Sequence, residues 1–187
     1  PGPLYHNGPA VWSCQALLQG NHVVVLARFD AEAVLESIQR HRVDVVYLVP
    51  TMMKRILRLD DAVRLGYDLS SLRVVWHLAE PCPPWLKEAW IDWLGAERIF
   101  ELYAGTEAQA ATIITGTDWL THRGSVGRVT SGEMKICDEE GNDLPVGEQG
   151  EVWMRSSRDT PTYRYVGADA KTLGDGWESL GDMGWFD

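Results

Sequence analysis

The sequence has few cysteines, no long apolar run and no excess of positive charge, and each absence argues against a class of protein. The three cysteines, Cys14, Cys82 and Cys137, are far apart and form no C-x-x-C pair, so a structural zinc site is not expected. Such sparse cysteines fit reduced thiols in the cytoplasm, where we expect the protein to be. No apolar stretch is long enough to span a bilayer. The net charge of −10 argues against nucleic acid as a partner, because such a surface needs clustered positive charge.

The composition is that of a folded chain. Of the 187 residues, 45% are hydrophobic and 24% are charged, which suffices for a packed core in one domain or two small lobes. The chain starts at Pro1 rather than at a methionine, and it stops at Asp187 shortly after a turn-like Gly-Asp-Met-Gly. We therefore interpret the chain as an internal fragment of a longer protein. Nothing in the sequence indicates the oligomeric state.

The first half of the chain alternates between segments that predict helices and segments that predict strands. This alternation predicts an α/β fold, with a mostly parallel sheet flanked by helices. Ligands of such sheets bind beyond the carboxyl ends of the strands, which places the segments after Val49, Leu78 and Tyr103 at one functional edge. We expect helices at 9–18, 30–40 with Asp30 as N-cap, 51–59 and 83–94, and strands at 22–26, 43–49, 72–78 and 99–103.

The second half has a different character. Short strand-like runs at 124–129, 132–138 and 150–155 are separated by Gly, Asp, Asn and Pro, and Glu140-Gly141-Asn142 is a good hairpin turn. This pattern predicts a small antiparallel β-rich lobe. We expect an α/β subdomain over residues 1–115 and a β-rich subdomain over residues 116–187.

The segment from Glu101 to Glu107, with the sequence ELYAGTE, carries the clearest chemical signal. An apolar strand leads into a tyrosine, two small residues, a hydroxyl and a carboxylate. Small residues let the backbone approach a ligand closely, a threonine hydroxyl can donate to a phosphate oxygen, and a carboxylate can hold Mg²⁺. The same residues also fit a strand that ends in a tight loop with an exposed acidic cap.

The sequence Tyr-Ala-Gly-Thr-Glu at residues 103–107 resembles the Tyr-Gly-x-Thr-Glu signature of adenylate-forming (AMP-binding) enzymes, which include acyl-CoA synthetases. Further segments resemble that family in the same order along essentially the whole chain. They are 3–8 (PLYHNG), 29–52 with its Val-Pro-Thr, 68–73 (DLSSLR), 124–128 (GSVGR), 147–152 (GEQGEV) and 176–182 (GWESLGD).

The resemblance implies a role for each matching residue. Tyr103 would stack on adenine, Thr106 would contact the α-phosphate, and Glu107 would bind Mg²⁺. Asp182 would accept hydrogen bonds from the ribose hydroxyls. His6 would lie at the acyl pocket, near the gate between the acyl and CoA tunnels; the alternative is a capping histidine in a turn. We expect Tyr103, Thr106, Glu107 and Asp182 to face one cleft between the two lobes.

Several positions depart from the family pattern. The family's Gly-Gly-Ala-Pro, whose backbone lies beside adenine, is here Leu-Ala79-Glu80-Pro. The Glu80 carboxylate could accept from the exocyclic amine of the base or point to solvent, and we favour solvent. Ala104 replaces a glycine and, with Gly105, would lie against the substrate, while Leu180 replaces the threonine before Gly-Asp.

Two family features are not in the sequence. The Ser/Thr/Gly-rich phosphate loop that ends in Pro-Lys is absent from residues 1–187, as is the C-terminal domain with its catalytic lysine. The implied parent enzyme uses ATP, Mg²⁺ and CoA to convert a carboxylic acid into acyl-AMP and then acyl-CoA, and we expect the fragment alone to be inactive.

The nature of the acid and the reaction class stay open at this point. The segments Tyr-His-Asn-Gly and Leu-Tyr-Ala-Gly-Thr-Glu resemble those of fatty-acid and bile-acid CoA ligases most, so we expect the substrate to be a bulky apolar acid. An amino-acid-activating adenylation domain is the alternative within enzymes, but no aspartate is convincingly placed after His6 to hold an amino group. A non-catalytic nucleotide-binding or interaction module is the other alternative, and in that case the site residues need not converge.

Overall fold

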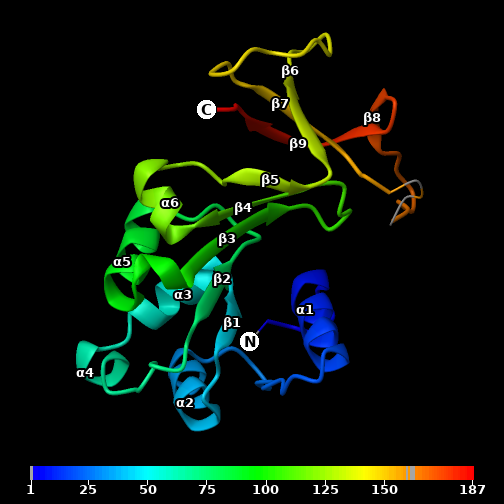
Figure 1. Cartoon of the computed structure of the whole chain (residues 1–187). Helices are drawn as coiled ribbons and strands as arrows, with labels where there is room; N and C mark the ends of the chain where they lie inside the picture. Colours follow the sequence, from blue (N-terminus) through cyan, green and yellow to red (C-terminus); the bar gives the residue numbers. More distant parts are fainter. Residues whose placement is uncertain (1, 159, 161–162) are drawn as a thin grey trace. The chain divides into compact units, whose positions relative to one another are not determined.

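The computed structural model describes residues 2–158, 160 and 163–187 (Figure 1). Contacts divide the chain into two compact units. We call Pro1–Leu102 with Ile114–Gly127 the α/β unit, and Tyr103–Ile113 with Arg128–Asp187 the β unit. The division thus differs from the single boundary expected at residue 115, because the loop after the third strand belongs to the later unit. Within the described residues, no helix is both long and apolar enough to cross a membrane.

The α/β unit is built on three parallel strands, as the alternating pattern predicts. They are β1 (Val45–Leu48), β2 (Val74–His77) and β3 (Ile99–Ala104), and they belong to a five-stranded sheet of order β1-β2-β3-β4-β5. The helices of this unit are α1 (Asn7–Leu18), α2 (Ala31–His41), α3 (Pro50–Leu57), α4 (Asp61–Arg64), α5 (Pro84–Leu94), the 3₁₀ helix η1 (Ala96–Arg98) and α6 (Gly116–Thr121).

Local signals explain where the long helices begin. The Asp30 side chain caps α2 by accepting a hydrogen bond from the Ala33 N–H at 2.9 Å. Prolines stand in the first turn of α3 and α5, where a missing N–H removes no helical hydrogen bond. The capped helix α2 then buries Val34, Leu35 and Ile38 against the sheet, so the predicted helix is confirmed.

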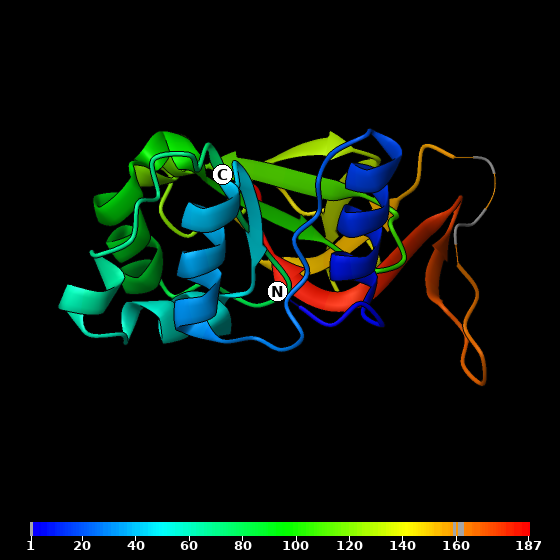
Figure 2. The same ribbon diagram turned by 90° about the horizontal axis from the view of Figure 1, so that it is seen from below.

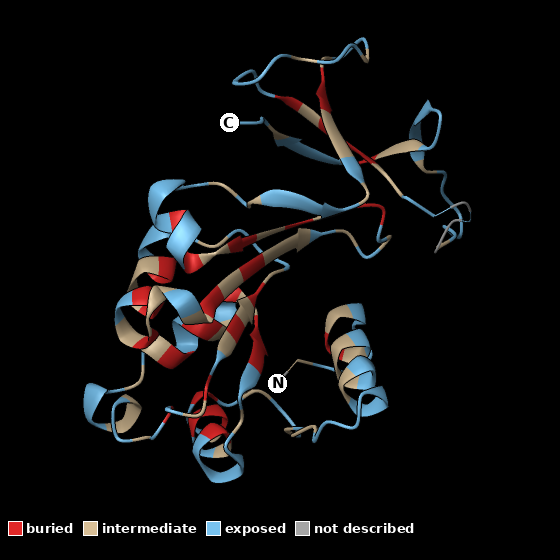
Figure 3. Ribbon diagram, in the orientation of Figure 1, coloured by how far each residue is buried: buried red, intermediate tan, exposed pale blue. Residues whose placement is uncertain are grey.

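The two faces of the parallel strands carry different residues. Val46, Leu48, Val75 and Ile99 point into the core formed with α2, α3 and α5, and this core is the red region among those elements in Figure 3. The alternate residues form an aromatic row across the strands on the opposite face. In register, Tyr47 pairs with Trp76 and Trp76 with Phe100, and Trp12 of α1 packs on the row.

Helix α1 lies on the aromatic face of β1, whereas α2 lies on the other face (Figure 2). Its single buried residue is Pro9, so α1 is weakly anchored compared with α2. A cavity of about 520 Å³ lies among α1, residues 21–26, the end of α2 and β1, and its lining includes Trp12 and Tyr47.

The prediction of a strand at residues 22–26 was wrong. The structure has no strand between α1 and α2, although His22-Val-Val-Val-Leu26 is rich in β-branched residues. Strand propensity expresses how well a residue fits a pleated surface beside a neighbouring strand, and no described strand pairs with this segment. Its residues are exposed or half-buried.

The β unit contains the predicted antiparallel sheet. Its order is β6-β7-β9-β8, with β6 (Glu133–Cys137) and β7 (Gly150–Arg155) close to the expected ranges. The hairpin of β8 (Lys171–Gly174) and β9 (Trp177–Gly184) was not predicted. It turns at Asp175-Gly176, where both residues have positive φ as a tight two-residue hairpin requires. The remaining strands, β4 (Ala111–Thr115) and β5 (Arg128–Ser131), pair antiparallel.

Candidate functional site

The loop that follows β3 packs closely against β9 inside the β unit. Gly105 marks the closest approach, because a Cβ at this position would overlap the Leu180 side chain and lie 2.9 Å from Oε2 of Glu107. Only glycine fits without displacing one of these neighbours. The glycine of the Tyr-Ala-Gly-Thr-Glu motif is therefore explained by packing against the strand that carries the Gly-Asp motif.

A hydrogen bond joins the two motifs directly. The Tyr103 hydroxyl donates to Oδ2 of Asp182 at 2.7 Å, although 79 residues separate them in sequence. Tyr103 is half-buried, and burial together with the neighbouring carboxylate raises the pKa of its phenol above the usual value. The aromatic ring and the exposed carboxylate are thus held side by side in the β unit.

Thr106 and Glu107, the last two residues of the motif, have different surroundings. Thr106 is exposed, as is Ala104 before it, whereas Glu107 is half-buried. The Tyr165 hydroxyl donates to Oε1 of Glu107 at 2.7 Å, and this hydrogen bond raises the pKa of the Tyr165 phenol. The Glu107 carboxylate is therefore oriented by a side chain from the segment before β8.

A second polar group lies beside this carboxylate and was not predicted from the sequence. Gln109 is 5% exposed, and its amide nitrogen donates to Oε2 of Glu178 at 3.0 Å and lies 3.5 Å from the Tyr163 hydroxyl. The Tyr163 hydroxyl donates to the same Glu178 oxygen at 2.7 Å, and its ring packs edge-on against Tyr165. Only the proximity of Gln109 to the motif could have indicated it, because its partners lie more than 50 residues away.

Three predicted residues lie in the α/β unit instead. His6 is exposed and occupies the N-cap position of α1, but its side chain makes no capping hydrogen bond. Ala79 has a φ of 74°, in the left-handed region that disfavours residues with a Cβ. The family pattern has a glycine at this position, so the backbone keeps the glycine-like conformation although the residue is alanine.

The expectation that Glu80 points to solvent was wrong. Although exposed, its Oε2 accepts hydrogen bonds from the backbone N–H of Thr51 at 3.1 Å and from the Thr51 hydroxyl at 2.8 Å. Thr51 lies in the first turn of α3, where N–H groups lack helical partners and negative charge is favourable. The contact joins the segments after β1 and β2, which confirms that these segments meet at the carboxyl edge of the parallel strands.

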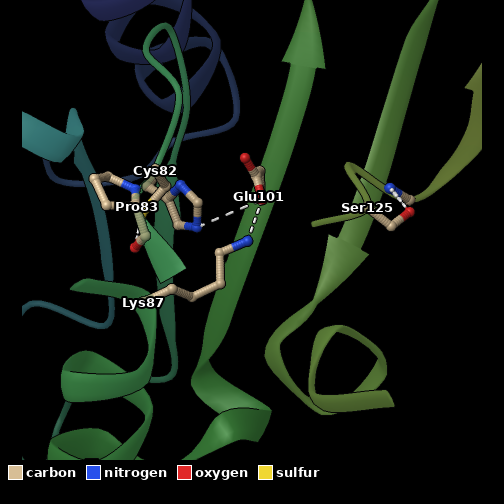
Figure 4. Close-up of polar contacts among 7 residues, drawn as sticks. Cys82, Pro83, Lys87, Glu101 and Ser125 are labelled. Carbon is tan, nitrogen blue, oxygen red and sulfur yellow. Dashed lines mark hydrogen bonds and ion pairs between the residues drawn. The ribbon is translucent and has the colours of Figure 1, made fainter. Parts of the chain in front are cut away.

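A buried charge cluster lies beneath the parallel strands of the α/β unit. Lys87 of α5 extends to form an ion pair with Glu101 of β3 (Figure 4), and its amino group also lies 4.9 Å from the centre of the Trp119 ring. His77 is fully buried beside them, with neither ring nitrogen hydrogen-bonded. Burial, and secondarily the Lys87 charge, lowers the pKa of His77 to about 3, so this imidazole is neutral.

The residues that could hold a divalent cation are few. Among the described residues, no three His, Cys, Asp or Glu side chains cluster as a metal site. Glu107 is the motif carboxylate, and a single carboxylate suits Mg²⁺ when substrate phosphates and water supply the remaining oxygens.

Comparison with known proteins gives consistent matches over the whole chain. The family model of the AMP-binding enzyme matches residues 1–164. The indoleacetate–CoA ligase of Aromatoleum aromaticum is 30% identical over 97% of this chain and 36% of its own length. The amide bond synthetase of Marinactinospora thermotolerans is 32% identical, with a TM-score of 0.81 over the whole chain and 38% of the synthetase.

The O-succinylbenzoate CoA synthetase of Bacillus subtilis in complex with ATP and magnesium is 25% identical, with a TM-score of 0.82 over the whole chain and 38% of that enzyme. The chain spans about a third of the length of the curated relatives it matches. These relatives include several CoA ligases. With the family model covering most of the sequence and the two family motifs joined in one unit, the chain belongs to the AMP-binding enzyme family.

Proposed function

We propose that this chain is part of an ATP-dependent acyl-CoA synthetase. The parent enzyme joins a carboxylate to the α-phosphorus of ATP with release of pyrophosphate, and the CoA thiolate then displaces AMP from the acyl-AMP. The observation that carries the proposal is the hydrogen bond between Tyr103 and Asp182. A structural module with no nucleotide to bind has no need to hold an aromatic ring and an exposed carboxylate together at the meeting point of two family motifs.

The β unit supplies the groups that would hold the nucleotide. The Tyr103 ring stacks on adenine, and Asp182 accepts hydrogen bonds from the ribose hydroxyls, which suit a carboxylate acceptor. Thr106 is exposed next to them and donates its hydroxyl to the α-phosphate. In the α/β unit, the family pattern assigns the backbone at Ala79 and Glu80 to contact with the base. Because Glu80 is held by Thr51, its carboxylate stabilises this turn and does not bind the adenine amine.

The donor set fits Mg²⁺. Glu107 presents a hard carboxylate ligand that Tyr165 already orients. When bound, Mg²⁺ neutralises charge on the phosphates during adenylation. The protein's own part is to position the phosphate beside Thr106 and to hold the nucleoside at Tyr103 and Asp182, so that the carboxylate is aligned for attack.

The aromatic row supports a bulky apolar acid as the substrate. His6 precedes α1, and Trp12 of the same helix packs on Tyr47 and Trp76. Trp12 and Trp76 are only half-buried, and such aromatic side chains give large apolar contact area to a ligand at low entropic cost. The family motifs assign His6 of the α/β unit to the acid, and they assign Ala104 and Gly105 of the β unit to the substrate. The free cysteines suit a reducing compartment, so we assign the parent to the cytoplasm.

Pyrophosphate release is the direct test. The full-length parent is assayed with ATP, Mg²⁺ and a panel of fatty, steroid and aryl acids. Asp182→Asn should lower kcat/KM by on the order of 10²-fold, the size of losing one preorganised polar contact, whereas Glu139→Gln, an exposed carboxylate elsewhere in the β unit, should not. Pyrophosphate release with amino acids alone supports the amino-acid-activating alternative. No release with any acid, and no ATP binding, supports the non-catalytic module.

The 187-residue chain should not adenylate an acid by itself. It contains no glycine-rich loop ending in Pro-Lys to hold the triphosphate. Losing a single charge-stabilising donor costs on the order of 10²–10³ in rate, and losing a whole loop costs more. Turnover of the chain comparable to that of the parent would show that the catalytic groups have been misplaced.

Amide formation is a second candidate for the step after adenylation. The similarity to the amide bond synthetase is as high, at 32% identity, as that to any CoA ligase reported above. Both products start from the same acyl-AMP, so the nucleotide site is unaffected by this choice. Product analysis by mass spectrometry, with CoA and a panel of amines offered in competition, decides between a thioester and an amide.

A further inference from the structure

The outer edge of β1 has no neighbouring strand in the part of the chain that the structure describes. The sheet has the order β1-β2-β3-β4-β5, so β2 pairs with one edge of β1 and the other edge is open. Natural proteins protect such edges with charged residues, proline or a cover. The sequence of β1, Val-Val-Tyr-Leu, has neither charge nor proline, and Val45 is 45% exposed. The edge therefore lacks the usual protection against pairing.

A second segment beside β1 has the composition of a strand but no strand partner. Residues 22–26 are rich in β-branched residues, and Val25 is 60% exposed. The cavity of about 520 Å³ lies between this segment and β1, with α1 and the end of α2 as its other walls. Two apolar segments that each lack a strand neighbour thus border the same cavity.

The handedness of chain crossovers determines on which side of β1 residues 22–26 belong. Parallel strands joined through a helix form a right-handed crossover in about 98% of cases, so the face that the helix covers sets the direction of the step across the sheet. The connection from β1 to β2 passes through α3, which packs on the core face together with α2. The step from residues 22–26 through α2 to β1 therefore runs in the same direction. Residues 22–26 accordingly belong beyond the open edge of β1.

Helix α1 lies on the opposite face of β1 from α2 (Figure 2). A parallel strand that leads into α1 must therefore step in the opposite direction to reach residues 22–26. Its place is on the β1 side of that segment. Because β2 holds the other edge of β1, this place is between residues 22–26 and β1, where the cavity lies.

The start of α1 fits a strand that arrives from this place. Gly2 and Pro9 line the cavity, and a Cβ on Gly8 would lie 2.7 Å from the Tyr47 hydroxyl oxygen. The chain therefore enters α1 beside the C-terminal half of β1. A strand parallel to β1 would end at this point.

We propose that the segment of the parent enzyme that immediately precedes Pro1 is a strand that docks in this cavity, parallel to β1 and between β1 and residues 22–26. The 187 residues span about a third of the length of the curated relatives, so a parent of similar length has chain to supply the strand. With α1 on one face and α2 on the other, the segment should be a continuous apolar run of about five residues. Residues 22–26 then form a strand as well.

The docked strand would create a reversal of strand order in the sheet. From it the chain steps away from β1, whereas from β1 the chain steps to β2. Parallel sheets bind ligands beyond the carboxyl ends of the strands at such a reversal. The segments that follow there are residues 3–8 with His6 and the start of α3 with Thr51. Docking would thus fix the loop that carries His6.

Cysteine pairs in the full-length parent test the docking, after Cys14, Cys82 and Cys137 have been replaced by alanine. Val45→Cys is combined with a cysteine at each of the third to seventh residues before Pro1, a scan that covers both faces of a strand. Neighbouring strands lie about 4.8 Å apart, which is within reach of a disulfide. At least one pair should therefore cross-link within the molecule on oxidation, as seen on a non-reducing gel.

The same scan with Val23→Cys and with Val24→Cys tests the other side of the docked strand and should also give a cross-link. The control pair is Val24→Cys with Val45→Cys. Its two positions would lie about 10 Å apart across the docked strand, so this pair should not cross-link.

Hydrogen exchange on the unmodified parent, followed by mass spectrometry, needs no substitution and so does not depend on the folding of a variant. The amides of the segment before Pro1 and of residues 23–26 should exchange on the order of 10²-fold or more slower than those of an unstructured peptide. Fast exchange in either segment would overturn the proposal.

The cross-links decide between the possible neighbours of β1. A link between positions 24 and 45, without one from position 45 to the scanned segment, would show that residues 22–26 pair with β1 directly. A link between two molecules at position 45 would show that a second copy covers the edge. Either result overturns the docked strand. Neither measurement involves ATP or an acid, so their outcome is independent of the proposed function.

Discussion

Acid should destabilise the α/β unit through His77. Its imidazole is fully buried, neither ring nitrogen is hydrogen-bonded, and Nε2 lies 4.0 Å from the Glu101 carboxylate. Burial, and secondarily the Lys87 charge, opposes the imidazolium, so the pKa falls to about 3 from the ordinary 6.5. Because the pKa of this base is lower in the folded state, His77 does not lower the free energy of unfolding above pH 6.5. The free energy of unfolding then decreases as the pH falls from 6.5 toward 3.

The magnitude follows from the two pKa values. Between them the unfolded chain binds one proton more than the folded chain, which corresponds to about 1.4 kcal/mol per pH unit. From pH 7 to pH 5 the loss is about 2 kcal/mol, since most of that interval lies below 6.5. The same loss lowers Tm by about 4–8 °C for a chain of this size.

The assay is urea unfolding at pH 7 and pH 5 for the unmodified chain and for His77→Gln, which cannot become an imidazolium. The variant is judged by its pH dependence and not by its absolute stability. The other four histidines are exposed and remain in both proteins, as does Glu101, so their contributions cancel in the comparison. The unmodified chain should lose about 2 kcal/mol more than the variant. Equal losses would refute the burial argument for His77.

Three further changes have distinct expected results. Lys87→Met leaves Glu101 as an unpaired buried carboxylate and should lower the free energy of unfolding in urea by about 3–5 kcal/mol. Adding Glu101→Leu should recover much of that loss. An unchanged unfolding midpoint for Lys87→Met would contradict a buried ion pair. Ala79→Gly relieves the left-handed backbone and should stabilise the fold by about 0.5–1 kcal/mol, and no gain would mean that alanine is unstrained there. Tyr103→Phe keeps the aromatic ring but loses the hydrogen bond to Asp182, whereas Tyr103→Ala also removes stacking worth about 1–3 kcal/mol. Calorimetry should therefore show weaker AMP binding for Tyr103→Ala than for Tyr103→Phe. The reverse order would exclude stacking of Tyr103 on adenine.

The elements predicted well from the sequence are those with a local cause. Asp30 caps α2, a proline opens α5, and β1, β2 and β3 are apolar runs between helices. The run at 22–26 has the same composition but no pairing strand, and this requirement cannot be read from the run itself. The hairpin of β8 and β9 contains exposed and polar residues that hide its alternation.

The candidate site was only partly predictable for a related reason. Tyr103 and Asp182 were found because each lies in a recognisable motif, and the structure brings them into contact. Gln109 and Tyr165 lie outside the motifs, and their importance depends on partners far away in sequence. Glu80 was assigned to solvent because its partner, Thr51, belongs to a different loop that only the parallel arrangement of β1 and β2 brings near.

The way the chain passes between its two units has a practical consequence for dissecting the protein. It leaves the α/β unit after Leu102, returns at Ile114 and leaves again after Gly127. A cut at the last passage would yield a C-terminal piece lacking Tyr103 and Gln109, and an N-terminal piece carrying a loop severed from its packing partner Leu180. Neither half is a self-contained folding unit, so deletion of either half tests the integrity of the other as much as it tests function. Point variants are therefore the informative tool for assigning roles in this chain.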